Sequence, residues 1–407
     1  MAIVKAFKSL RPAPEQADQV ACVPYDVINT EEARALAGDN PKSFLRVIRS
    51  EIEFGEGQDP YAEEIYQRAK DNLNALVESG ALIEDQEQAL YIYQIHMGDH
   101  VQTGVVGCSA VDDYDNDLVK IHEKTRPVKE NDRTKHMVTL GAHTGPVFLA
   151  YKQQAEIDAL VEKETKETPL YDVKAEDGVR HIVWKAKDSD AISVAFSKVP
   201  ETYVADGHHR AKSSSRAREE MRSRNSQHSG DEDYNFFLSV LFPHNQLQIL
   251  PYNRVIYKVS KSPEDILNEL SAYYAVDKGA SPSPERKGDV SMYLDGSWYG
   301  LRPLDDQPQG NPVEALDVSV LQEEALTPVF GIGDPRTDEN IDFIGGIRGT
   351  EELVRLVDGG KAAVAFSMYP VSIEELFAVA DQGLLMAPKS TWFEPKLRSG
   401  LFVHRFG

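Results

Sequence analysis

The sequence predicts a mixed α/β fold (α+β), in which antiparallel hairpins and helices are interspersed. Two segments with strand-like alternation, 90–111 and 290–301, each contain a turn signal and are typical of β-hairpins. Apolar residues at helical spacing over 60–82 predict an amphipathic helix. Strands and helices do not alternate regularly along the chain, so a doubly wound parallel sheet is not expected. The hydrophobic fraction of 41% is enough to build a globular core.

The N-terminal elements follow from local signals. After a short strand and a proline-containing loop, Asn29 or Thr30 precedes two glutamates and indicates a helix start. The helix over 60–82 has a stop signal at Gly80. Gly98-Asp99 is the turn signal of the first hairpin.

The remaining elements are short. Three apolar runs predict buried strands, because strands that are covered on both faces lose their polar alternation. Asp295-Gly296 predicts the turn of the second hairpin. The buried strands are expected at 146–150, 202–205 and 236–242, helices at 262–274 and 373–380, a further strand at 362–366, and a loop at 305–311.

The chain is long enough for two or three domains, or for one large intertwined α/β unit. We predict an N-terminal α/β part over 1–115, a catalytic core over 116–260 and a C-terminal α+β part over 261–407 that closes the site. No internal repeat and no coiled-coil pattern is present in the sequence.

Charge restricts the partners that the protein can bind. The chain has 44 Lys and Arg against 66 Asp and Glu, a net charge of -22, which repels phosphate backbones and disfavours nucleic acid. No run of about 18 apolar residues predicts a membrane span, and the first residues do not resemble a signal peptide. With only Cys22 and Cys108, a disulfide framework is excluded, and we expect a cytoplasmic protein with a small-molecule substrate.

Residues 120–136 concentrate positive charge inside this acidic chain. The segment, KIHEKTRPVKENDRTKH, holds six Lys or Arg residues against three acids. Glu123 is surrounded by cations, which would keep its carboxylate ionised in a buried site. A solvated helix face is the ordinary interpretation of such a charge run. The alternative is an anion-binding site that contains His122, Glu123, Lys124, Arg126 and Arg133.

A second cationic segment follows the predicted strand at 202–205. Asp206 and Gly207 form a turn, and His208, His209 and Arg210 begin a helix rich in Lys and Arg. A strand, a glycine turn and a helix N-terminus together present backbone N–H groups to an anion. Two alternatives stay open. Asp206 could be a plain helix cap with the histidines on the surface, or the histidine pair and Asp206 could bind a transition metal.

The third cationic segment is PKSTWFEPKLRSG, residues 388–400. Lys389, Lys396 and Arg398 lie in it among two hydroxyl residues and two prolines. It is interpreted either as a cap over a bound anion or as a stiff C-terminal extension.

Four motifs together resemble the domain of unknown function 1015 family. They are VPYDVI (23–28), HEKT (122–125), ADGHHR (205–210) and PKSTWFEPKLRSG (388–400), and they occur in the order of the family over nearly the whole chain. The DGHHR element is also similar to a segment of the ParB/sulfiredoxin-like fold, which opens a helix and holds nucleotide phosphates. Relatives with that fold include free-serine kinases. The resemblance therefore implies a ParB/sulfiredoxin-like core, elaborated with additional hairpins and helices.

On these grounds the leading hypothesis is a small-molecule kinase that transfers a phosphoryl group from ATP or ADP, with Mg²⁺, to the hydroxyl of free L-serine. Such a reaction requires cations around the phosphoryl group and a carboxylate for the hydroxyl proton. Glu123 is the expected base, with Asp206 as its rival or the metal-facing carboxylate and His122 as a further catalytic candidate. The phosphate-binding candidates are Gly207, His208, His209 and Arg210, and the substrate-binding candidates are Lys124, Arg126, Arg133, Lys389, Lys396 and Arg398.

Two other functions compete with the kinase. A nucleotide-binding regulatory module would use the same phosphate site as a switch, and a phosphometabolite hydrolase would use water as the acceptor. The sequence contains no P-loop, no G-x-G-x-x-G after a strand and no kinase catalytic loop, so nucleotide chemistry would require an unusual scaffold.

Overall fold

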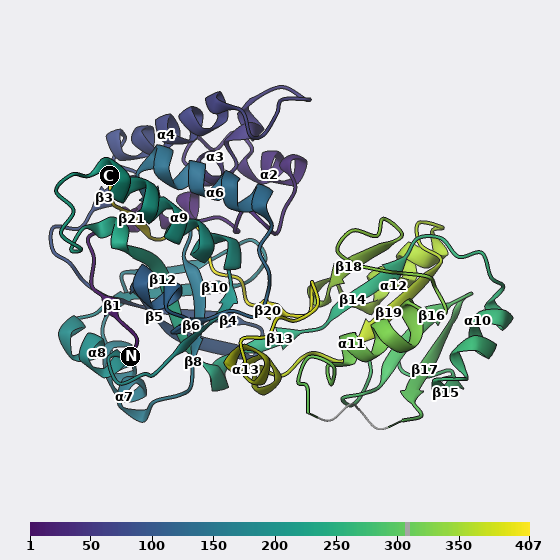
Figure 1. Ribbon diagram of the computed structural model, residues 1–407. Coiled ribbons are helices and arrows are strands. Elements are labelled where there is room, and N and C mark those ends of the chain that lie inside the picture. Colours follow the sequence, from purple (N-terminus) through teal and green to yellow (C-terminus); the bar gives the residue numbers. More distant parts are fainter. Residues whose placement is uncertain (306–309) are drawn as a thin grey trace. The chain divides into compact units, whose positions relative to one another are not determined.

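The computed structural model describes residues 1–305 and 310–407, and Figure 1 shows its helices and strands. The predicted mixed α/β class is confirmed. The chain forms two compact units. The first comprises residues 1–121, 125–247 and 395–407, and the second comprises 122–124 and 248–394. The division into three segments stays a prediction, and residues 306–309 of the predicted loop at 305–311 lie outside the described residues.

The first unit is built on a large mixed sheet. Its strand order is β6-β11-β8-β12-β5-β4-β10-β9, with β1 added to β5. These strands are β1 (Val4–Lys5), β4 (Tyr91–Met97), β5 (His100–Ala110), β6 (Val119–Lys120), β8 (Val147–Tyr151), β9 (Tyr171–Lys174), β10 (Arg180–Lys185), β11 (Thr202–Asp206) and β12 (Phe236–Pro243). A second sheet has the order β3-β2-β21-β7 and consists of β2 (Ser9–Pro12), β3 (Leu82–Glu84), β7 (Ala142–His143) and β21 (Val403–Arg405).

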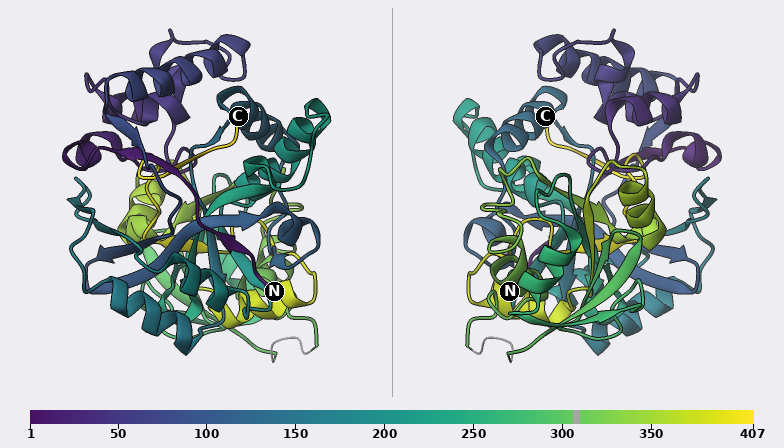
Figure 2. Two further views of the ribbon diagram at one scale, coloured as in Figure 1. Left: turned by 90° about the vertical axis from the view of Figure 1, so that its left-hand side faces the viewer. Right: turned by 90° about the vertical axis from the view of Figure 1, so that its right-hand side faces the viewer.

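Nine α-helices belong to the described part of this unit. They are α1 (Ala17–Val20), α2 (Thr30–Ala37), α3 (Leu45–Ile48), α4 (Glu63–Glu78), α5 (Val111–Asp115), α6 (Pro127–Leu140), α7 (Ala155–Glu164), α8 (Ser189–Phe196) and α9 (His208–Arg224). Helices α6 and α9 pack against each other. The C-terminus returns to the end of α6, where the Phe406 N–H donates to the Gly141 carbonyl (Figure 2).

The three predicted buried strands are confirmed and lie next to one another. They correspond to β8, β11 and β12, and β8 is the central strand of the three, antiparallel to β11 and parallel to β12. Residues from these strands, among them Val147, Leu149, Val204 and Phe237, are buried in one apolar core. The first hairpin is also confirmed as β4 and β5, with Gly98 at φ 58° in its turn.

The second unit contains a six-stranded sheet with the order β15-β17-β16-β19-β14-β18. Its strands are β14 (Tyr252–Ile256), β15 (Tyr274–Lys278), β16 (Val290–Leu294), β17 (Ser297–Pro303), β18 (Ile341–Gly345) and β19 (Val364–Met368). The separate pair β13 (Gln248–Leu250) and β20 (Trp392–Glu394) and the helices α10 (Pro263–Leu270), α11 (Asp317–Leu321), α12 (Gly349–Asp358) and α13 (Ile373–Asp381) complete its described part.

One predicted boundary in the second unit is wrong. The helix expected over 262–274 ends at Leu270, and Tyr274 begins β15. Tyr274 is fully buried and pairs with Pro303 across the sheet, so sheet packing outweighs the helical pattern there. The hairpin predicted around Asp295-Gly296 is confirmed, with both residues at positive φ as a two-residue hairpin turn requires.

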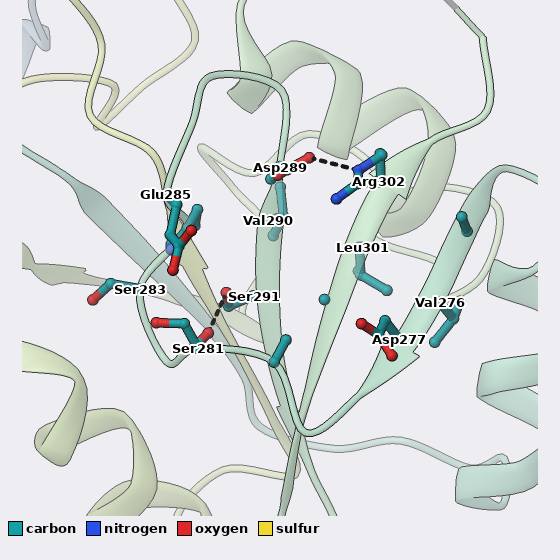
Figure 3. Close-up of a pocket in the computed structure, with 14 residues that line it drawn as sticks. Val276, Asp277, Ser281, Ser283, Glu285, Asp289, Val290, Ser291, Leu301 and Arg302 are labelled. Atoms are coloured by element: carbon teal, nitrogen blue, oxygen red, sulfur yellow. Dashed lines mark hydrogen bonds and ion pairs between the residues drawn. The ribbon is translucent and has the colours of Figure 1, made fainter.

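A cavity of about 300 Å³ lies against β15, β16 and β17 in this unit (Figure 3). Ser291 Oγ donates a hydrogen bond of 2.8 Å to the Ser281 carbonyl, and Arg302 Nε lies 3.4 Å from an oxygen of Asp289. Asp277 and Glu285 also line the cavity, so acids outnumber cations there. It does not contain any of the residues that the sequence singles out.

We expect Asn29→Ala to weaken α2. The Asn29 side chain accepts a hydrogen bond from the Glu32 N–H, and the Glu32 side chain accepts one from the Asn29 N–H, so both form a capping box. Loss of such a cap costs about 1 kcal/mol, which corresponds to roughly five-fold faster amide exchange by local opening. Hydrogen exchange of residues 30–37 measures the effect. Asn116→Ala is the control, and equal exchange in both variants would contradict the prediction.

Candidate functional site

The turn before α9 requires glycine. Strand β11 ends at Asp206, Gly207 adopts φ 96°, and the 17-residue helix α9 begins at His208. A Cβ atom on residue 207 would lie 2.9 Å from Arg210 Nε, so a side chain there is excluded by sterics as well as by backbone conformation. No side chain caps this helix N-terminus. The predicted strand, glycine turn and helix are therefore present.

Arg210 lies at the centre of a charged cluster in the first unit. Its Nη2 is 3.0 Å from an oxygen of Asp206 and 3.7 Å from an oxygen of Asp26, and its Nη1 donates to the Pro146 carbonyl. The side chain is almost fully buried. Its Nε is enclosed and has no hydrogen-bond partner among the described residues. Asp26, from the VPYDVI motif, is thereby brought to the DGHHR turn.

Lys396 supplies a second cation to the same cluster. Its Nζ lies 3.7 Å from the second oxygen of Asp206, and its side chain is only 13% exposed. Two cations, Arg210 and Lys396, thus face two partly exposed carboxylates, Asp26 and Asp206. Lys396 therefore brings the C-terminal motif to the DGHHR turn.

His209 occupies the first turn of α9 as a neutral imidazole. Its Nε2 accepts a hydrogen bond of 3.0 Å from the Arg126 N–H. Burial lowers its pKa, while Asp26 opposes this shift. A neutral ring does not conflict with the positive end of the helix dipole. Arg126 therefore reaches the site through its backbone, and its own side chain is exposed. His208 is buried.

Arg133 borders the cluster from α6. Its guanidinium lies 4.3 Å from the centre of the Tyr25 ring and pairs with Asp132 at 2.8 Å. Tyr25, Arg133 and Arg210 line a small cavity of about 20 Å³. The pKa of the Tyr25 hydroxyl is raised, first by burial and then by Asp26. The hydroxyl therefore remains protonated at neutral pH.

Arg398 lies apart from these carboxylates. Its guanidinium pairs with Asp177, and its Nε donates to His181 Nε2 at 3.0 Å. The next residue, Ser399, exchanges two backbone hydrogen bonds with Cys22, which carries a buried thiol. Ser399 lines the small cavity with Arg210. Lys396 and Arg398 are close in sequence, but their side chains contact different parts of the first unit.

The remaining predicted residues belong to the second unit. His122 is fully buried, its Nε2 is 3.1 Å from Thr391 Oγ1, and its carbonyl accepts from the Met386 N–H. Lys389 adopts φ 57° and places its Nζ 5.3 Å from the centre of the Tyr252 ring. The HEK part of HEKT and the PKST part of the C-terminal motif are therefore neighbours. Glu123, which follows His122, is partly buried, and Lys124 is exposed.

Several residues that no sequence signal indicated complete the cluster. Asp132 holds Arg133 and accepts from the Tyr66 hydroxyl at 2.9 Å. The Pro146 carbonyl, which accepts from Arg210, has no side-chain signal in the sequence. Ser399 belongs to the C-terminal motif, but only the charged residues of that motif were predicted to bind a ligand. Among the described residues, no group of three or more His, Cys, Asp or Glu side chains could hold a metal ion.

We expect the first unit to lose stability in acid through His136. Burial, and then Arg133, lowers the pKa of His136 to about 4, whereas an unfolded histidine titrates near 6.5. The unfolded state therefore binds the extra proton first, so the stabilisation is complete above about pH 6.5 and is lost as the pH falls toward 4. The loss is on the order of 3 kcal/mol.

Urea unfolding between pH 7 and pH 4 measures this slope. His136→Gln can still donate to the Val47 carbonyl, to which His136 Nε2 lies at 3.0 Å, but it cannot titrate. Its stability should fall less steeply with pH than that of the wild type. Half-buried His100 provides the control through His100→Gln, and parallel slopes for wild type and His136→Gln would contradict the assignment.

A family model described as "Protein of unknown function (DUF1015)" matches residues 4–319. The chain belongs to this family. The resemblance inferred from the four motifs is thereby confirmed. No curated protein matches this DUF1015 chain. None of its described helices is long and apolar enough to cross a membrane.

Solved structures with some similarity were also found. A conserved hypothetical protein from Pyrococcus furiosus has 13% sequence identity and a TM-score of 0.35, covering 74% of this chain and 95% of its own. A free serine kinase variant in complex with ADP has 14% identity and a TM-score of 0.35, covering 74% and 94%. C-terminally truncated SbnI from Staphylococcus aureus has 11% identity and a TM-score of 0.39, covering 74% and 87%. Likeness at this level does not establish a shared activity.

Proposed function

We propose that this DUF1015 protein is a small-molecule phosphotransferase that transfers a phosphoryl group from a nucleotide to an alcohol, with free L-serine as the leading acceptor. The observation that carries this proposal is the cluster around Arg210. A buried arginine, a second cation and two carboxylates surround an uncapped helix N-terminus behind a glycine turn. Phosphoryl transfer requires cations and positioned donors rather than covalent chemistry from the protein.

The charge arrangement supports phosphate binding at this turn. Asp26 and Asp206 are each about one-third exposed, whereas Arg210 and Lys396 are nearly buried. Solvent screens the carboxylates more than the cations, so a phosphate at the uncapped amides would experience a net attraction. The neutral His209 ring next to these amides adds no repulsion to the arriving anion and can donate through Nδ1.

Magnesium fits the same residues. Asp26 and Asp206 both contact one nitrogen of Arg210, which places their carboxylates near each other. Mg²⁺ in phosphoryl-transfer sites is usually held by one or two carboxylates together with the phosphates. Asp26 and Asp206 would hold it, and the ion would neutralise charge on the donor phosphates.

Glu123 remains the proposed general base, with Asp206 as the rival. The backbone before Glu123 is held by His122, whose ring forms a hydrogen bond with Thr391 and whose carbonyl accepts one from the Met386 N–H. Lys124 and Lys389 are proposed to bind the acceptor. Arg126 and Arg133 are proposed to supplement the anion site from the start and the middle of α6.

The test is a phosphotransfer assay on the purified protein with ATP or ADP, Mg²⁺ and a panel of amino acids and hydroxylated metabolites, with products identified by mass spectrometry. O-phospho-L-serine is the expected product. Nucleotide binding without transfer to any acceptor would favour the regulatory module. Release of inorganic phosphate from phosphorylated metabolites would favour the hydrolase, and absence of nucleotide binding would contradict the assignment of the DGHHR turn.

A further inference from the structure

A larger cavity in the first unit lies around Arg398. It has a volume of about 560 Å³, within the range of small-molecule sites. It is bounded by α2, by the segments before and after that helix, by β9 and the turn that follows it, and by the C-terminal motif. None of Asp26, Asp206, Arg210 and Lys396 lines it. It is therefore separate from the proposed phosphate site.

Arg398 is the buried charge in this cavity. Its side chain is only 7% exposed, Nε donates to His181, and Nη2 pairs with Asp177. Nη1 of Arg398 makes no hydrogen bond to a described residue, and this nitrogen is not fully enclosed by the protein. This nitrogen is therefore accessible to a molecule inside the cavity.

The ring of His181 carries no charge and therefore does not compensate the positive charge of Arg398. Its Nε2 accepts from Arg398, and its Nδ1 lies 2.7 Å from the Tyr93 hydroxyl. Burial, and then Arg398, lowers the pKa of His181 to about 3, so the ring is neutral at physiological pH. The carboxylate that faces the guanidinium is Asp177, and its side chain is 48% exposed. Water screens that carboxylate, and a bound anion could share the guanidinium with it.

The rest of the lining contains two further kinds of surface. Asp18 and Glu176 are exposed acids at the cavity, and Lys174 is an exposed cation there, so with Asp177 acids are in excess at the solvent side. Val23, Leu36, Leu45, Val173 and Leu401 form an aliphatic wall, and Gln19, Asn40 and Ser43 add polar groups to the lining. The cavity thus combines a buried cation, an acidic opening and an aliphatic wall.

We propose that this cavity binds a small aliphatic α-amino acid in its zwitterionic form. The carboxylate takes the guanidinium of Arg398, the ammonium group lies toward Asp177 and the other acids at the opening, and the side chain packs on the aliphatic wall. A simple anion would be repelled by the acidic opening, and a simple cation would be repelled by Arg398. The proposal does not depend on the phosphotransferase function, since no described residue of the proposed phosphate site is used.

Isothermal titration calorimetry with L-valine as the probe tests the proposal. L-valine is expected to bind saturably. Isovalerate, which lacks the ammonium group, and isobutylamine, which lacks the carboxylate, should each bind at least about ten-fold more weakly, because each loses one charged hydrogen-bonded contact. If no aliphatic L-amino acid binds at millimolar concentration, or if either analogue binds as well as L-valine, the proposal is wrong.

Variants separate the contacts from the fold. Arg398→Gln should lose L-valine binding, and Asp177→Asn should weaken it, whereas Asp172→Asn, which changes an exposed acid on β9 outside the cavity, is the matched control. Leu36→Trp replaces Arg398→Gln as the test if the latter does not fold. It fills the cavity from a position that is 53% exposed and should also block binding. Unchanged L-valine affinity in Leu36→Trp or Asp177→Asn would overturn the proposal. AMP binding should be unchanged in Asp177→Asn, which distinguishes a failure here from a failure of the phosphate site.

Discussion

A Glu123→Gln variant is expected to retain nucleotide binding and to lose turnover by about 10²- to 10⁴-fold, the usual contribution of a general base. The substitution preserves the size of the side chain and its capacity for hydrogen bonds but removes the carboxylate that accepts the hydroxyl proton. His122 remains anchored to Thr391 and Met386 in the variant, so the backbone at residue 123 should not move. Product formation by mass spectrometry and nucleotide affinity by calorimetry measure the two effects.

The matched control for this variant is Glu219→Gln. Glu219 is exposed on α9, and the substitution makes the same change of charge away from the cluster. Turnover in the control should equal that of the wild type. If Glu123→Gln turns over normally while Asp206→Asn does not, the required carboxylate is Asp206, as the base or as the proposed magnesium ligand. Full turnover in both variants would contradict a carboxylate base at either position.

Arg210→Ala is expected to weaken nucleotide binding by about 10- to 100-fold, which corresponds to the loss of a charged hydrogen bond of about 1.5–3 kcal/mol. The effect has two parts. The guanidinium no longer attracts the phosphates, and Asp26 and Asp206 lose the cation that compensates them, so the site becomes negative. Calorimetric titration with ADP measures the change.

Two further variants control the Arg210 experiment. Arg222→Ala removes an exposed arginine from the same helix and should not change ADP affinity. Arg210→Lys keeps the charge but cannot reach Asp206, Asp26 and the Pro146 carbonyl with one planar group. Its ADP affinity should lie between those of the wild type and Arg210→Ala. This variant replaces Arg210→Ala as the test if the alanine variant does not fold. Unchanged ADP affinity in a folded Arg210→Ala protein would mean that the DGHHR turn does not bind the donor.

Local structure could be predicted where the signal is carried by a few neighbouring residues. The capping box of Asn29 and Glu32, the turns at Gly98 and Asp295-Gly296, and the glycine before α9 each depend on backbone conformations that few residue types adopt. The end of α10 could not be predicted in this way. Tyr274 leaves the helical pattern because its partner in the sheet, Pro303, is 29 positions away in sequence.

The candidate site was only partly predictable for the same reason. The residue types of DGHHR and the glycine turn indicated an anion site, and Asp26 belongs to one of the four recognised motifs. The sequence did not indicate which acidic residue pairs with which basic residue. Lys396 meets Asp206, whereas Arg398, two residues later, contacts Asp177 and His181, although residues two apart in a regular strand would point to the same side.

The sequence by itself determined the mixed α/β class, the position of the main strands and of the two longest helices, α4 and α9, the family, and the charged motifs. These depend on periodicity, turn chemistry and residue type, which are local properties. The tertiary structure alone decided that Asp26, Asp206, Arg210 and Lys396 form one cluster and that Arg398 lies in a separate cavity. Contacts within the cluster join residues up to 190 positions apart, from Asp206 to Lys396, and they arise from the pairing of strands and the packing of helices, which no short stretch of sequence encodes.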